Sequence, residues 1–138
     1  MKSRRSLFAA ALSAIALFMI ATPTALAADA ADITTAFNHP LPNLPGNSVT
    51  GILVAYEPGG KSAAHRHAGS VVAYVLTGAI RSENSATGAA RVYKAGESFF
   101  EPAGSVHLVS ENASATEPAS LLAVFVAEDG ATLTTPEN

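Results

Sequence analysis

The sequence predicts an all-β fold, because short apolar runs alternate with turn residues over most of its 138 residues. The runs are rich in Val, Ile, Leu, Phe and Tyr, and Gly, Pro, Asn and Ser separate them. No window beyond residue 27 shows apolar residues at helical spacing. Hydrophobic residues make up 49% of the chain and charged residues 14%, which indicates a packed core in a single domain. Many short strands joined by Gly and Pro turns form a β-sandwich or a β-barrel.

Residues 1–27 have the three parts of a secretory signal peptide. A basic start is followed by an apolar run over 7–21 and by an A-x-A cleavage site at 25–27. The apolar run is short for a membrane span, so we expect cleavage that leaves no stable membrane anchor. The alternative is an uncleaved anchor or a buried helix. We expect a mature protein that is periplasmic or secreted.

Two export routes fit this segment. Residues 3–8 (S-R-R-S-L-F) resemble the twin-arginine signal, whose pathway exports folded proteins. An ordinary Sec signal that contains two arginines by chance is the alternative.

The charge and cysteine content exclude several classes of protein. Cleavage after Ala27 leaves five basic and eleven acidic residues, so the mature chain carries a net charge of −6. An acidic domain without a basic cluster is a poor nucleic-acid binder. The chain has no cysteine, which excludes disulfides and thiolate metal ligands.

Residues 28–48 form an N-terminal leader to the domain, with a possible edge strand at 33–37. Four turn-forming residues in the segment 39–46 predict irregular structure there. His39 lies in this segment, and we interpret it as a loop histidine.

Seven strands are predicted in the domain, which we place at 49–128. They cover residues 49–56, 71–76, 79–83, 90–93, 98–100, 106–109 and 121–127. A polar loop at 84–89 and a connector at 112–118 separate some of them, and a polar C-terminal tail follows at 129–138.

His65 and His67 are the first candidate functional residues. Residues two apart in a strand project to the same face, so both imidazoles can reach one point. Such a pair suits a metal ion. Arg66, between them, is expected to face away.

Two stretches that contain these residues resemble the two motifs of the cupin superfamily, G-x5-H-x-H-x3-E-x6-G and G-x5-P-x-G-x2-H-x3-N. Eight fixed positions match, namely Gly59, His65, His67, Gly78, Gly96, Pro102, Gly104 and His107. Val71 stands where the first motif has its metal-binding glutamate, and Glu111 replaces the terminal asparagine of the second. The resemblance covers about residues 52–126 and implies a double-stranded β-helix, or jelly-roll barrel, with a cavity.

The resemblance implies a divalent metal ion bound by His65, His67 and His107. Three neutral imidazoles leave coordination positions free, which is typical of a catalytic centre. The site is similar to that of cupins without the motif glutamate, which use ferrous iron to cleave diketones or oxidise thiols. We therefore favour Fe2+, with Mn2+, Ni2+ or Zn2+ as alternatives, and a metal-dependent oxidoreductase of dioxygenase type.

Two carboxylates are candidates to compensate for Val71. Glu111 lies two residues from Val109 and four from His107, so it shares their face if the strand continues, and it could act as a general base. A solvated strand-end glutamate is the alternative, and Glu101, just before Pro102, is the second candidate.

A non-catalytic cupin that binds a small molecule, with a structural or absent metal, is the other function class. In both classes the partner is a small molecule held among core aromatic residues. The resemblance further implies a homodimer.

Overall fold

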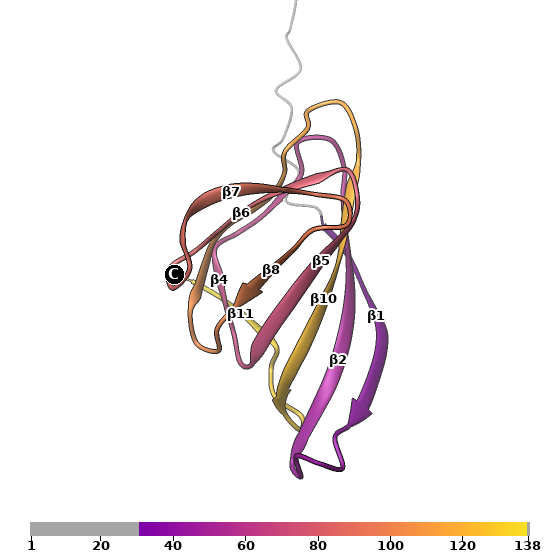
Figure 1. The fold of residues 1–138 in the computed structure, drawn as a ribbon, viewed down its shortest axis with the longest axis vertical. Helices are drawn as coiled ribbons and strands as arrows, with labels where there is room; N and C mark the ends of the chain where they lie inside the picture. Colours follow the sequence, from indigo (N-terminus) through magenta and orange to yellow (C-terminus); the bar gives the residue numbers. More distant parts are fainter. Residues whose placement is uncertain (1–30, 138) are drawn as a thin grey trace, which may run out of the picture.

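Eleven strands and no helix make up residues 31–137, the part of the chain that the computed structural model describes. The predicted signal peptide and the start of the leader lie outside the described residues. No helix in the described part is long and apolar enough to cross a membrane. The strands form two antiparallel sheets (Figure 1).

The first sheet has five strands in the order β1-β2-β10-β5-β8. Their bounds are Ala31–Pro40 for β1, Asn47–Tyr56 for β2, Ala119–Glu128 for β10, Ser70–Thr77 for β5 and Ser98–Glu101 for β8. The longest strands, β1, β2 and β10, are paired over their full length.

The second sheet has the order β11-β4-β9-β6-β7, and β3 also pairs with β9. Their bounds are Thr134–Pro136 for β11, His65–His67 for β4, Val106–Asn112 for β9, Ala79–Asn84 for β6, Gly88–Lys94 for β7 and Lys61–Ser62 for β3. His65 and His67 of β4 and His107 of β9 therefore lie in this sheet.

The core fills the space between the sheets, and strand alternation explains its composition. On β5, Val71, Ala73 and Val75 point inward, whereas Val72 and Tyr74 point outward. The same alternation on β10 buries Leu121, Ala123 and Phe125, and Ile80 reaches the core from β6. The predicted all-β jelly-roll fold is confirmed.

The bounds of β1 differ from the prediction, and β3, β4 and β11 are not among the predicted strands. The edge strand predicted at 33–37 extends over Ala31–Pro40, because the residues at both ends of β1 pair with residues of β2. His39 is therefore a strand residue and not a loop residue, with Pro40 at the strand end, where its missing N–H costs little. The short strand β3 was not predicted.

The C-terminal segment also contains a strand that the sequence did not predict. Thr134–Pro136 form β11, which pairs with His65–His67 of β4. The segment 129–138 therefore includes an edge of the second sheet, beside the candidate histidines, where the sequence predicts a polar tail.

One turn fixes the two histidine stretches against each other. Gly104 has φ +75°, which glycine adopts without strain, and it lies in the turn between β8 and β9. Its N–H donates to the carbonyl of His67 over 3.1 Å, and Arg66 Nη1 donates to the Gly104 carbonyl over 2.8 Å. The turn thus places the start of β9 beside β4.

Candidate metal centre

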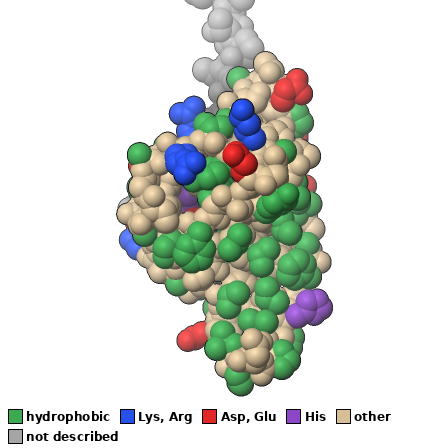
Figure 2. All heavy atoms as spheres, viewed as in Figure 1, with side chains coloured by type: hydrophobic (Ala, Val, Ile, Leu, Met, Phe, Trp, Pro, Cys, Tyr) green, Lys and Arg blue, Asp and Glu red, His purple; other side chains and the backbone are tan. Residues whose placement is uncertain are grey.

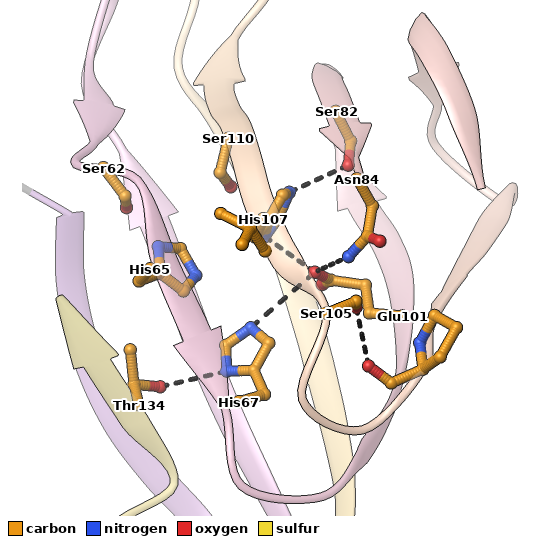
Figure 3. Close-up of polar contacts among 12 residues, drawn as sticks. Ser62, His65, His67, Ser82, Asn84, Glu101, Ser105, His107, Ser110 and Thr134 are labelled. Atoms are coloured by element: carbon orange, nitrogen blue, oxygen red, sulfur yellow. Dashed lines mark hydrogen bonds and ion pairs between the residues drawn. The ribbon is translucent and has the colours of Figure 1, made fainter. Parts of the chain in front are cut away.

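Three histidine side chains meet inside the barrel at the junction of β4 and β9 (Figure 3). His65 pairs directly with His107 in the antiparallel register, and His67 follows two residues along β4. One ligand atom from each ring lies within 4.8 Å of the other two. His67 and His107 are 7% and 3% exposed, and His65 is half-buried. The structure therefore brings together the three residues that the sequence singles out.

Hydrogen bonds fix the proton positions on two of the rings. His65 Nδ1 lies 2.7 Å from the carbonyl oxygen of Ala63, and His67 Nδ1 lies 3.2 Å from that of Leu133. A carbonyl oxygen only accepts, so Nδ1 carries the proton in both rings and Nε2 keeps its lone pair. This is the form that a metal-binding histidine takes when its second nitrogen is held by a carbonyl.

Burial keeps these imidazoles in the uncharged form. Desolvation lowers the pKa of His65, against the effect of its bond to Ala63. Desolvation also lowers the pKa of His67, although the charge of Glu101 acts in the opposite direction. Both rings are therefore neutral, and able to bind a metal, at neutral pH.

Glu101 is the carboxylate that the structure places in this cluster. It is 2% exposed, and Oε2 lies 3.0 Å from His107 Nδ1 and 3.8 Å from His67 Nε2. Burial raises the pKa of Glu101, but the hydrogen bond from His107 and the charge of His107 lower it. Their combined effect exceeds that of burial, so the pKa of Glu101 lies below its ordinary value. The sequence ranks Glu101 second because it predicts that the strand ends at residue 100, whereas β8 continues to Glu101 and turns its side chain inward.

The expectation that Glu111 shares the inward face of His107 is wrong. Glu111 pairs with Arg81 on β6, and its carboxylate lies 3.2 Å from the Arg81 guanidinium with 35% of the side chain exposed. The reason is a β-bulge in β9. His107 and Val109, two residues apart on β9, pair with the adjacent residues Asn84 and Glu83 on β6, so β9 has one extra residue there. The extra residue inverts the alternation, so Ser110 faces inward and Glu111 faces outward.

Arg66 lies as the sequence predicts, outside the cluster. Its guanidinium forms an ion pair with Glu137 at the surface. The Arg66 side chain is therefore not part of the cluster.

Two polar residues of β6 complete the inner shell, and the sequence did not identify them. Ser82 Oγ lies 2.9 Å from His107 Nε2, and Asn84 Nδ2 donates to Glu101 Oε2 over 3.2 Å. Both are buried, on the face of β6 that also buries Ile80. Polar residues at the inward positions of a strand were the signal that could have identified them.

A largely apolar cavity of about 470 Å³ opens next to the cluster. Its lining consists of Ile33, Ile52, Val54, Tyr56, Ser62, Ala63, Ala64, His65, His67, Ala73, Phe99, Glu101, His107, Ser110, Leu121, Ala123, Phe125, Thr132, Leu133, Thr134 and Pro136. The Phe125 ring packs against the His67 ring with centroids 5.0 Å apart. This volume suits a small organic molecule that has one end at the histidines.

A second polar group lines the same cavity. The Tyr56 hydroxyl lies 2.8 Å from Ser62 Oγ and 2.9 Å from Ser110 Oγ. The three hydroxyls come from β2, β3 and β9, so they also connect the two sheets. The cavity therefore has a second polar group among its apolar walls.

The donor set fits a divalent metal ion. Three imidazoles converge, two of them with a free Nε2 lone pair, and a buried carboxylate lies next to them. Nitrogen and oxygen donors of this kind suit Fe2+, Mn2+, Ni2+ and Zn2+. His65, His67 and His107 are the residues that would hold the ion.

Comparison with known proteins gives one family. Residues 52–125 match the family model of the cupin domain. No curated protein matches the sequence.

Solved structures share the fold. A Klebsiella pneumoniae protein with a double-stranded β-helix domain is 21% identical, with a TM-score of 0.60 over 78% of this chain and 85% of that chain. A Thermus thermophilus protein is 27% identical, with a TM-score of 0.56 over 73% of this chain and 86% of that chain. A mutant of Bacillus subtilis oxalate decarboxylase is 27% identical, with a TM-score of 0.53; the match covers 64% of this chain but only 23% of that enzyme.

Proposed function

Because this chain belongs to the cupin domain family, we propose that it is an exported metal-dependent enzyme of dioxygenase type that acts on a small apolar molecule. The observation that carries the proposal is the convergence of His65, His67 and His107 at the end of an apolar cavity. When bound, a divalent ion supplies Lewis acidity, and ferrous iron also supplies electrons to dioxygen.

The residues of the chain would prepare the substrate for this chemistry. The apolar walls exclude water from the reacting end, with Phe99 and Phe125 beside the histidines. Tyr56, which also lines the cavity, can donate a hydrogen bond to a polar atom of the substrate. A planar molecule with oxygen atoms that bind metal, such as a diketone or flavonol, fits these requirements.

The likeness to oxalate decarboxylase supports an enzyme that acts on a small molecule, but not oxalate as the substrate. Oxalate is a dianion without an apolar part. The cavity walls are mostly aliphatic and aromatic, and they would not replace the hydration of two carboxylates.

Elemental analysis of the protein purified from its export route tests the proposal. We expect about one iron, manganese or nickel ion per chain in the wild type, and its loss in both His65→Ala and His107→Ala. Oxygen-uptake assays with diketones, thiols and flavonols then identify the substrate class. Absence of metal from the wild type, with both variants folded as before, contradicts the enzyme proposal.

A non-catalytic binding protein is the second candidate, and the hydrogen bonds of His107 favour it. Both of its ring nitrogens already have hydrogen-bond partners, Ser82 and Glu101, so the cluster is satisfied without an ion. In this case an apolar fluorescent probe binds the cavity equally well before and after treatment with a chelator.

Export is part of the proposal, by a Sec signal or by the twin-arginine route, which would allow the metal to be loaded in the cytoplasm. Replacement of Arg4 and Arg5 by lysine distinguishes the two routes. Retention of the double variant in the cytoplasm identifies the twin-arginine route, and unchanged export identifies a Sec signal.

We also propose a homodimer. Hydrophobic side chains gather over β8, β5 and β10 on one face of the molecule (Figure 2). Val72 and Phe100 form a cross-strand pair there, and they are 47% and 49% exposed. An apolar surface of this kind is typical of an interface between copies of a chain.

A further inference from the structure

The position of Glu101 relative to Val71 carries an inference about the metal centre that rests on the proposed metal-dependent function. Val71, which stands where the first motif has its carboxylate, pairs directly with Glu101 across β5 and β8. Directly opposed residues in an antiparallel pair project to the same face with their Cβ atoms about 5 Å apart. The Glu101 side chain therefore enters the barrel one strand away from the position of the missing carboxylate.

We propose that Glu101 is the fourth protein ligand of the metal, and that the carboxylate of the first motif has been transferred across the strand pair to this position. The donors around one ion, each about 2.1 Å from it, lie roughly 3.0–3.4 Å apart. Glu101 Oε2 is 3.0 Å from His107 Nδ1, within this range, and 3.8 Å from His67 Nε2, which requires a shift of a few tenths of an ångström.

The orientation of His107 distinguishes a ligand from a residue that merely orients the ring. If Glu101 only accepted the N–H of His107 Nδ1, then Nε2 would have to bind the metal. Figure 3 shows Nε2 turned toward Ser82 and away from His65 and His67, and the distance to Ser82 Oγ is 2.9 Å. The His107 nitrogen left to bind an ion together with His65 and His67 is therefore Nδ1. An ion bound to Nδ1 lies next to Glu101.

The remaining partners fit this assignment. With the metal at Nδ1, the Nε2 proton of His107 is donated to Ser82, as the second nitrogens of His65 and His67 donate to carbonyl oxygens. Asn84 Nδ2 then holds the Glu101 carboxylate in place.

Charge supports the same conclusion. Among residues 31–137, the titratable side chains that contact the Glu101 carboxylate are His67 and His107, so this 2% exposed carboxylate has no lysine or arginine partner. A divalent ion would supply the missing compensation. The carboxylate oxygen also moves the preference of the site toward Mn2+ and Fe2+.

Titration with Mn2+, monitored by the electron paramagnetic resonance signal of the free ion, tests the proposal. We expect Glu101→Gln to weaken Mn2+ binding at least about 30-fold. The matched control is Glu111→Gln, the same substitution at the outward-facing carboxylate, and we expect binding within about twofold of wild type. Equal affinities of wild type and Glu101→Gln contradict the proposal.

Loss of affinity alone does not separate a ligand from an orienting residue, so a Mn2+-loaded wild-type crystal is the second measurement. We expect a Glu101 oxygen about 2.2 Å from the ion. An ion held by the histidines with both Glu101 oxygens beyond about 3 Å overturns the inference while leaving the metal-dependent function intact. Failure of the wild type to bind any of Mn2+, Fe2+, Ni2+ and Zn2+ overturns both. The crystal needs no variant, so it also decides the case if Glu101→Gln does not fold.

Discussion

Removal of the Tyr56 hydroxyl should weaken both the barrel and the binding of ligands in its cavity. Tyr56 is 2% exposed on β2, and its hydroxyl forms the hydrogen bonds to Ser62 and Ser110 on the opposite sheet. In Tyr56→Phe both serines lose their partner at almost no change in volume. At about 1 kcal/mol for each bond, we expect the free energy of unfolding to fall by about 2 kcal/mol.

Urea unfolding followed by circular dichroism measures this change. For a domain of roughly 110 residues the same loss lowers Tm by about 8 °C. The matched control is Tyr74→Phe, because Tyr74 is 45% exposed on the outer face of β5 and should change stability by less than about 0.5 kcal/mol. A Tyr56→Phe variant as stable as Tyr74→Phe refutes the role assigned to the three hydroxyls.

Three further predictions follow from the site and the surface. In the metal-free protein, the free energy of unfolding should fall as the pH drops below 6.5, because the folded-state pKa values of His65 and His67 are lowered and the unfolded chain binds the protons first. It should fall again below 4.5 as Glu101, whose folded-state pKa is also lowered, becomes protonated. Urea titrations across this range check both steps, and a stability that rises on acidification contradicts them. Ala123→Leu, which adds volume inside the cavity, should weaken binding of an apolar fluorescent probe at least about tenfold, whereas unchanged binding places the ligand elsewhere. Phe100→Asp should convert the dimer to a monomer in sedimentation measurements, and a dimer that survives it uses another surface.

The spacing of residues along single strands could be read from the sequence. Alternation over two residues predicted that His65 and His67 face one point, and the motif spacing added His107. The same local signals placed the strands that became β2, β5, β6 and β10 within a few residues of their observed bounds. These features depend on neighbours in the chain, which is the information that a single sequence contains.

The carboxylate could not be assigned in this way. Whether a strand residue faces inward depends on counting residues from a known position, and one inserted residue inverts the count. The bulge between His107 and Val109 turned Glu111 outward, and the unpredicted last residue of β8 turned Glu101 inward. A bulge is specified by pairing with another strand, and the sequence of β9 alone does not show it.

The sequence by itself therefore determined an all-β fold, because strand and turn signals are local, and its resemblance to the two cupin motifs added the jelly-roll topology and the three histidines. Only the tertiary structure decided which carboxylate meets them, that Ser82 and Asn84 hold that group, and that Tyr56 faces the same cavity. These contacts join strands that are far apart in the chain. Their register, and not their composition, sets which side chains meet.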